Sequence, residues 1–172
     1  MSVRDQLMDH VPRLRRYARA LIRNRDLADD LVQDTLERAL RHTDKFQSGT
    51  DLRAWLFTIM HNVFANQASR AGARAVHVSV DDDTLPESQF AVADTQSQPL
   101  EVRDLDYALQ RLPVEQRQVV LLVGLEELSY AEVALALDIP LGTVMSRLSR
   151  GRERLRALMA GTQTGAKLKV VR

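Results

Sequence analysis

Apolar residues recur at the spacing of amphipathic helices over the first 75 residues of the chain. The first run keeps a helical period and comprises Leu7, Val11, Leu14, Tyr17, Ala18 and Leu21. The second follows Asp26, a good N-cap residue, and comprises Leu27, Leu31, Leu36, Ala39 and Leu40. The third follows Asp51 and comprises Leu52, Trp55, Leu56, Ile59, Met60, Val63 and Phe64. The pattern therefore predicts three or four helices, with a loop at 42–50 before the third run.

The helical period is lost from about residue 71 to 99 and then returns. This segment holds three consecutive aspartates and two prolines, a composition typical of a flexible acidic linker. Helical spacing resumes at residue 100, whereas residues 161–172 lack apolar periodicity and predict a disordered basic tail. We therefore expect an all-α fold of two small helical domains, at 1–75 and 100–160. A mobile linker at 76–99 would let them take many relative orientations.

Residues 126–156 carry the pattern of two short helices joined by a tight turn. Ser129 is a good N-cap, and Glu132 stands three residues later to complete a capping box. The helix must end near Pro140, because proline lacks a backbone N–H and restricts the residue before it. Asp138 suits this turn, since aspartate tolerates the left-handed conformation better than most residues. The pattern is that of a helix-turn-helix.

The second helix of this pair begins near Gly142 and is strongly basic on its outer side. Val144 and Leu148 lie four residues apart and face inward. The positions on or near the outward side are hydroxyl and guanidinium side chains: Thr143, Ser146, Arg147, Ser149, Arg150 and Arg152. Arginines contact guanine or phosphate oxygens, and hydroxyls contact base edges or backbone, so this helix suits a DNA major groove. The alternative is a surface hairpin with solvated arginines.

Charge is segregated along the chain although the formal net charge is only +1. Residues 13–25 contain six arginines and no acid, and residues 77–106 are strongly acidic. Such blocks suggest contacts with both an anion and another protein. The chain has no cysteine, no apolar run long enough to cross a membrane and no signal-peptide core, so we expect a cytoplasmic protein.

The third predicted helix has a neutral hydrogen-bonding face opposite its apolar stripe. That face carries Thr58, His61, Asn62, Ala65 and Ser69. No acidic residue occurs from position 52 to 74, and arginines flank the face. Amides and imidazole can contact base edges while arginines hold phosphates, so this face suits single-stranded or melted DNA. An ordinary polar helix surface is the alternative.

Four motifs in this order resemble those of the extracytoplasmic-function group of bacterial sigma factors, the smallest of the sigma-70 family. They are Asp30–Ala39, Leu52–Asn62, Leu112–Val119, and Ser129–Ala134 together with Gly142–Leu148. The resemblance covers roughly residues 5–158, apart from most of the linker. It implies a dissociable polymerase subunit that recognises and melts promoters, with an N-terminal domain for the −10 element and a C-terminal domain for the −35 element.

The resemblance also implies roles for individual residues. Asp30, Gln33 and Asp34 match the positions that dock on core RNA polymerase. The loop containing Phe46, Gln47 and Ser48 matches the loop that receives a flipped −10 base, and Asn62 matches an asparagine on the adjoining helix. The neutral face of that helix, which also carries Thr58 and His61, adds these two residues to the expected −10 contacts. Thr143, Ser146, Arg147, Ser149 and Arg150 match the −35 contact surface. The expected partners are core polymerase, promoter DNA and an anti-sigma factor that wedges between the domains.

Three other functions compete with this interpretation. An enzyme is disfavoured because the four histidines are scattered, no phosphate-binding glycine loop is present, and no thiol exists, so we expect no catalytic residues, metal or cofactor. A dimeric helix-turn-helix regulator of duplex operators would leave the neutral face of the third helix unused. A protein-interaction adaptor would not need the basic recognition helix.

Overall fold

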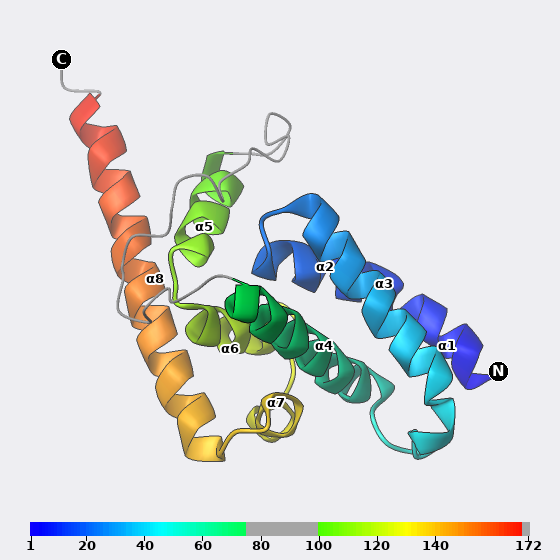
Figure 1. Cartoon of the computed structure of the whole chain (residues 1–172). Coiled ribbons are helices and arrows are strands. Elements are labelled where there is room, and N and C mark those ends of the chain that lie inside the picture. Colours follow the sequence, from blue (N-terminus) through cyan, green and yellow to red (C-terminus); the bar gives the residue numbers. More distant parts are fainter. Residues whose placement is uncertain (75–99, 170–172) are drawn as a thin grey trace.

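The computed structural model describes residues 1–74 and 100–169. Within these two ranges the regular structure is entirely helical, with α-helices α1–α8 (labelled in Figure 1) and one short 3-10 turn. The expectation of an all-α fold is confirmed. The predicted linker at 76–99 lies outside the described residues.

The N-terminal half contains four α-helices, and the first predicted helix is divided in two. These helices are α1 (Val3–Asp9), α2 (Val11–Leu21), α3 (Arg25–Arg41) and α4 (Leu52–Arg74). The break falls at His10, which ends α1, and Pro12 occupies the first turn of α2. Because proline lacks an N–H and its ring crowds the carbonyl four residues earlier, residues 7–21 cannot form one straight helix. The apolar period alone did not reveal this break.

The caps of α3 and α4 were predicted with different success. Asn24, rather than Asp26, caps α3, and its Oδ1 accepts the Leu27 N–H at 3.1 Å. Asp26 lies in the first turn, where a carboxylate favours the positive end of the helix dipole. Asp51 precedes α4 as expected, and its Oδ1 accepts the Arg53 N–H at 2.9 Å. Between the two helices the chain forms the 3-10 turn Thr43–Lys45.

The C-terminal half contains α5 (Leu100–Gln110), α6 (Val114–Gly124), α7 (Tyr130–Leu137) and α8 (Leu141–Lys169). The predicted capping box of α7 is present, with Ser129 Oγ accepting the Glu132 N–H at 3.1 Å and Glu132 Oε1 accepting the Ser129 N–H at 2.9 Å. The turn after α7 passes through Asp138 in the left-handed conformation, at φ 53° and ψ 51°. The helix-turn-helix pattern is therefore realised as the sequence predicted.

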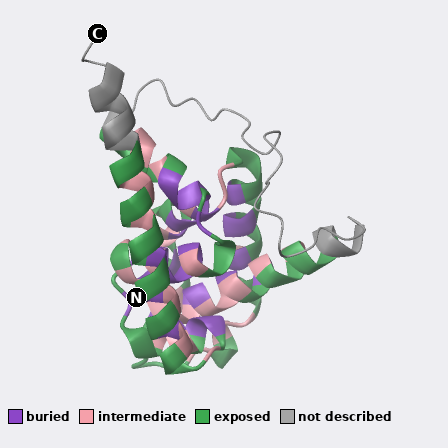
Figure 2. Cartoon of the chain, turned by 90° about the vertical axis from the view of Figure 1, so that its left-hand side faces the viewer, coloured by how far each residue is buried: buried purple, intermediate pink, exposed green. Residues whose placement is uncertain are grey.

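Helix α8 extends beyond the predicted end of the C-terminal domain. It continues through Lys169, into the segment 161–172 that we expected to be disordered. Extending an existing helix adds a hydrogen bond per residue without a new nucleation step, so apolar periodicity is not required for continuation. Figure 2 shows that the outward side of α8 is exposed over residues 141–161, while buried residues gather where the helices meet.

The two halves pack against each other, although we expected them to be independently oriented. Helix α2 contacts α5 and α6, and α4 contacts α7. At the end of α2, Gln110 Nε2 donates to Ala20 O at 2.7 Å and Arg117 Nη1 donates to Leu21 O at 2.8 Å. The relative placement of the halves is thus set by direct side-chain contacts.

Helices α6 and α8 approach closely at Gly151, which is buried. A Cβ at this position would lie 2.8 Å from Val120 Cγ2 and 3.4 Å from Gln116 Cβ. The valine is β-branched and stiff at χ1, so it cannot easily move aside. The absence of a side chain at residue 151 therefore allows the long helix to reach its neighbour.

We expect Gly151→Ala to lower the free energy of unfolding by about 1–3 kcal/mol, because the gain in helix propensity is outweighed by overpacking. Urea denaturation followed by circular dichroism measures the change. Gly161→Ala is the control. Gly161 belongs to the same helix, and a Cβ at this position would have no neighbour within 4 Å. Equal stability of the Gly151 variant and the wild type would contradict this account of the α6–α8 contact.

Candidate nucleic-acid interface

The first turns of α8 present the residues expected to contact the −35 element. Ser146, Ser149 and Arg150 are exposed, whereas Val144 and Leu148 are buried against the other helices. Ser146 Oγ donates to Thr143 O at 3.1 Å, which leaves the oxygen free to accept. The hydroxyls and the guanidinium of Arg150 therefore share one outward face, as the spacing predicted.

Arg147 on the same helix is less available for contact with DNA than its neighbours, because it is partly buried and paired with an acid. Its side chain is 27% exposed and its Nη2 lies 3.8 Å from Glu115 Oε2 at the start of α6. An ion pair of this length at a partly solvated site is weak and easily exchanged. Arg147 can thus turn from Glu115 to a phosphate at small cost.

The loop before α4 holds Phe46 against Trp55, with ring centroids 5.3 Å apart. Phe46 is half-buried, while Gln47 and Ser48 are exposed. The carbonyl of Gln47 accepts from the N–H of Thr50 at 3.1 Å and from its Oγ1 at 2.7 Å, which closes the loop. The residues expected to receive a flipped base therefore lie on a compact turn anchored by an aromatic pair.

The neutral face of α4 is not uniformly open. Asn62 is exposed, but His61 is half-buried and lies near Asp138 at the end of α7. Thr58 Oγ1 donates to Ala54 O at 3.0 Å, so its hydroxyl is engaged with its own helix. Helix α7 packs along α4, and the half-burial of His61 close to Asp138 indicates that it covers the His61 part of the face that we expected to contact melted DNA.

Asp30, Gln33 and Asp34 are all exposed on α3, so the expected polymerase-docking residues share one surface. Asp34 accepts a hydrogen bond from Gln67 Nε2 at 2.9 Å. Gln33 also lines an open groove of about 530 Å³ between α2 and α3, whose apolar walls include Val32 and Leu36. This surface combines acidic side chains with a shallow apolar depression.

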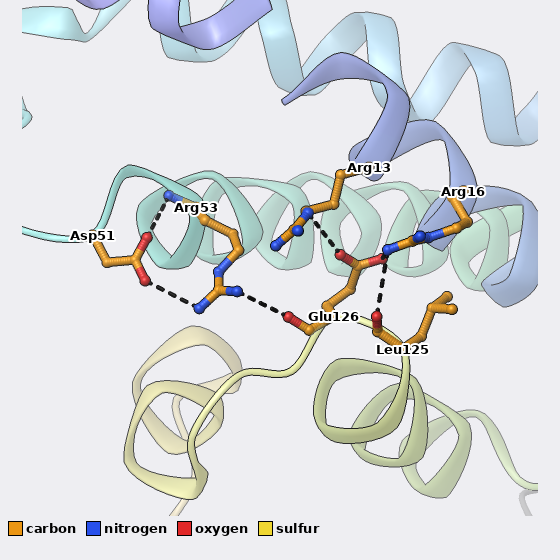
Figure 3. A network of polar contacts seen from close by, with 6 residues as sticks. All are labelled: Arg13, Arg16, Asp51, Arg53, Leu125 and Glu126. Atoms are coloured by element: carbon orange, nitrogen blue, oxygen red, sulfur yellow. Dashed lines mark hydrogen bonds and ion pairs between the residues drawn. The ribbon is translucent and has the colours of Figure 1, made fainter. Parts of the chain in front are cut away.

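A polar network that the sequence did not predict joins the two halves of the chain. Figure 3 shows Arg13 and Arg16 of α2, and Arg53 of α4, converging on Glu126 in the loop before α7. Arg13 Nε lies 3.5 Å from Glu126 Oε2, and Arg16 Nη2 lies 3.2 Å from Oε1. Arg53 Nη1 donates to the carbonyl oxygen of Glu126 at 3.1 Å and also pairs with Asp51.

Glu126 is unusual among acidic residues because it is buried, with only 1% of the residue exposed. Burial raises the pKa of Glu126 above its ordinary value, and the neighbouring arginines only partly oppose that rise. The next residue, Glu127, has a left-handed backbone with φ 56°. The charged carboxylate is therefore held at a cost in desolvation and backbone strain.

Sequence reasoning placed the expected contact residues on their helices but missed this network. The charge blocks, which include the basic run at 13–25, suggest a contact with an anion, but they do not indicate that the anion is a glutamate of the same chain. Glu126 stands beside Glu127 in the sequence and looks like one of two ordinary surface acids. No local pattern distinguishes the buried glutamate from its exposed neighbour.

Comparison with known families identifies two matches in the order that the motifs suggested. A family model described as the Sigma2 domain of PhyR matches residues 7–61, and one described as Sigma-70, region 4 matches residues 103–155. The first match contains α2, α3 and the beginning of α4. The second contains the helix-turn-helix.

Individual proteins resemble the whole chain. The sigma factor EcfG of Rhodopseudomonas palustris, an ECF RNA polymerase sigma factor, is 40% identical over 92% of this chain and 85% of its own length. The sigma factor RpoE of Bartonella quintana, solved with the anti-sigma factor NepR, has a TM-score of 0.75 and 37% identity, covering 98% of this chain and 97% of that one. The structure of CnrH with the cytosolic domain of CnrY has a TM-score of 0.64 and 27% identity, covering 91% and 86%.

Neither a membrane span nor a metal site is found in the described residues. None of their helices combines the length and apolar character needed to cross a bilayer. Likewise, no cluster of three or more potential ligand side chains occurs within 1–74 and 100–169.

The half-buried imidazole of His61 makes the packing of α4 against α7 sensitive to pH. Burial lowers the pKa of His61 below its ordinary 6.5, with Asp138 partly opposing the change. An exposed histidine binds a proton more readily, so the folded chain loses stability as pH falls from 6.5 towards that lower pKa. We expect His61→Gln to reduce the loss of stability between pH 7.5 and 5.5, measured by urea denaturation.

His10 provides a second contribution of the same sign, since burial also lowers its pKa. His61→Gln should therefore leave a residual pH dependence that His10→Gln reduces further. An unchanged pH dependence in the His61 variant would show that α7 does not desolvate this imidazole in solution.

Proposed function

The chain belongs to the extracytoplasmic-function RNA polymerase sigma factors of the sigma-70 family, and we propose how its two halves divide promoter recognition. It is an alternative sigma factor, which directs core polymerase to particular promoters. In our proposal, residues 1–75 bind core polymerase and read and melt the −10 element, and residues 100–160 bind the −35 element. The observation that carries this division is the order of the sigma2 and region 4 matches along one chain.

The −35 assignment is supported by the exposed hydroxyl and arginine side chains on the first turns of α8. Ser146, Ser149 and Arg150 project from a helix whose inner side is fixed by the buried Val144 and Leu148. A rigidly seated helix with such an outer face can enter the major groove and place hydroxyls and guanidinium groups against base edges. Thr143 and Arg147 would add contacts at the margins of the same face.

The −10 assignment is supported by the loop at Phe46–Ser48 and by the polar face of α4. Asn62 is exposed, and Thr58 and His61 lie on the same side of the helix, which carries no acidic residue. Since α7 covers part of this face, promoter binding would require α7 to move away from α4. The halves must therefore separate before melted DNA is bound.

Docking on core polymerase is assigned to Asp30, Gln33 and Asp34. Their common exposure on α3 supports this role. The helix dipole does not explain an acid as far along as Asp34, whose structural contact is the hydrogen bond from Gln67 of α4. The groove beside Gln33 would accept apolar side chains of the partner.

Control by an anti-sigma factor is proposed from the relatives. RpoE of Bartonella quintana was solved with the anti-sigma factor NepR, and CnrH with the cytosolic domain of CnrY. A corresponding partner of this chain would hold the two halves in an inactive arrangement. We propose no enzymatic activity, cofactor or metal, and we place the protein in the cytoplasm with the polymerase.

Run-off transcription with core polymerase on a genomic promoter pool tests the proposed function. The full chain should produce transcripts from a restricted set of promoters that core polymerase alone does not use. A dimeric operator-binding regulator would instead bind duplex DNA unaided and elute as a dimer in gel filtration, with no change when core polymerase is added.

We expect the double substitution Asp30→Lys with Asp34→Lys to weaken core polymerase binding on the order of tenfold or more. The two lysines would face the basic groups of polymerase that the acidic side chains are proposed to contact, and like charges across an interface are strongly unfavourable. Affinity pull-down and fluorescence titration measure the change. Asp9→Lys with Asp44→Lys is the control, because it alters the net charge equally at exposed sites elsewhere in the N-terminal half. Equal core affinity of the two double variants would remove the assignment to α3.

Arg150→Ala should cost on the order of 1–3 kcal/mol in binding to −35 DNA and relax preference at one base pair, provided that the guanidinium contacts a base. If Arg150 contacts only phosphate, binding weakens evenly across sequences and the salt dependence decreases. Arg156→Ala, at an exposed position further along α8, serves as the control. Unaltered affinity and salt dependence would mean that Arg150 is merely solvated.

A further inference from the structure

The convergence of Arg13, Arg16 and Arg53 creates an anion site on the N-terminal half. The three side chains come from two different helices, yet all contact Glu126 (Figure 3). Two of them pair with its carboxylate and the third donates to its backbone carbonyl. Arg16 Nη2 additionally lies 3.4 Å from Leu125 O. An anion is therefore already bound at this site, and it is supplied by the chain's own C-terminal half.

Removal of Glu126 would leave the site with excess positive charge. In the described part of the chain, the ion pairs of Arg13 and Arg16 both end on Glu126, whereas Arg53 keeps Asp51 as a second partner. Residues 10–25, which contain both arginines, include no acid. Once the halves separate, the guanidinium groups of Arg13 and Arg16 would lose their ion pairs with Glu126 and could bind another anion. Guanidinium groups are well suited to phosphate oxygens.

Glu126 is a displaceable occupant. Its carboxylate is fully buried, and the raised pKa indicates that the arginines do not fully compensate for the loss of water. The left-handed Glu127 beside it adds backbone strain. A phosphate that remains partly solvated would not bear these costs, so it can compete for the same arginines.

The location of the site connects it with the proposed −10 surface. Arg53 stands in the first turn of α4, and the half-buried Thr58 and His61 and the exposed Asn62 follow it along the same helix. The loop bearing Glu126 continues directly into α7, which packs on α4. One movement of this loop and helix would therefore expose both the arginines and the covered part of the α4 face.

We propose that Arg13, Arg16 and Arg53 bind a backbone phosphate of single-stranded promoter DNA, and that Glu126 occupies this phosphate site in the closed arrangement of the free chain. Closure of the two halves and DNA binding then exclude each other. The inference rests on the proposed role of α4 in binding melted −10 DNA, and it adds the phosphate contact and the internal competitor.

The first experiment replaces the competitor. Glu126→Lys places a cation among the three arginines and should separate the halves. Glu127→Lys is the matched control, because it adds the same charge at the adjacent exposed position. The measurements are the radius of gyration by small-angle scattering and the affinity for a fluorescent single-stranded DNA of about 12 nucleotides by anisotropy. We expect a larger radius and about tenfold tighter binding for Glu126→Lys than for Glu127→Lys, as if an open form populated at about a tenth became dominant.

The second experiment removes the arginines in the opened protein. Adding Arg13→Ala and Arg16→Ala to Glu126→Lys should abolish the gain in affinity and lower the slope of log affinity against log salt by about 1.4, the value for two lost contacts on single-stranded DNA. Arg15→Ala, on the same helix but absent from the Glu126 network, should retain the gain. If the double alanine variant is poorly folded by circular dichroism, Arg16→Ala alone supplies the test, since this side chain is 53% exposed.

Three results would overturn the inference. An unchanged radius for Glu126→Lys would show that Glu126 does not hold the halves together. Separation without tighter DNA binding than Glu127→Lys, or a gain that survives loss of Arg13 and Arg16, would show that the arginines are not a phosphate site. Run-off transcription by the wild-type chain with core polymerase is scored separately, so failure of the sigma-factor assignment is distinguishable from failure of this site.

Discussion

The arrangement of the molecule depends on Arg117, a buried arginine that satisfies the ends of two helices at once. The terminal carbonyls of a helix have no partner within the helix and must be paired when they are buried. Arg117 donates to the carbonyl oxygens of Leu109, Gln110 and Leu112 around the end of α5, and to that of Leu21 at the end of α2, at 2.8–2.9 Å. Burial lowers the pKa of Arg117, opposed by Asp106, but the planar fork of arginine still suits these diverging acceptors.

Because one side chain serves both halves, the packing within the C-terminal half and its docking on α2 are linked. Gln110 adds a hydrogen bond to Ala20 beside this point, and Glu126 adds the arginine network further along. These contacts are polar, whereas the buried apolar residues of both halves also belong to one continuous core, for example Leu21 and Leu109. The halves are therefore held in register by apolar packing as well as by polar contacts, and parting them would expose both kinds of surface to water or to a partner.

This closure conflicts with the proposed activity. Helix α7 belongs to the helix-turn-helix, yet it also lies over the polar face of α4, so the two candidate DNA surfaces are not both available in the closed form. In contrast, the outer face of α8 and the acidic surface of α3 are exposed. The molecule thus exposes the residues proposed to dock on polymerase while it covers part of the α4 face. Partner binding at α3 and opening at α4 are physically separable events.

The sequence by itself determined the features that depend on neighbours three or four residues apart. The capping box at Ser129 and Glu132, the left-handed turn at Asp138, and the inward side of α8 were all predicted correctly, because each rests on local hydrogen bonds or helical periodicity. Local reasoning failed where two local effects compete, as at the break after α1 and the cap of α3, or where a helix continues without an apolar stripe. The family motifs placed the candidate contact residues on their helices.

Only the tertiary structure decided how the halves meet, and therefore which candidate surfaces are covered. Arg16 and Glu126 are 110 residues apart in the chain, and Arg117 and Leu21 are 96 apart. Nothing in the composition around Glu126 indicates burial, because the charge of its partners lies on helices distant in sequence. Burial of a carboxylate is determined by the three-dimensional field of opposing charges and carbonyls around it, and that field exists only after the helices have packed.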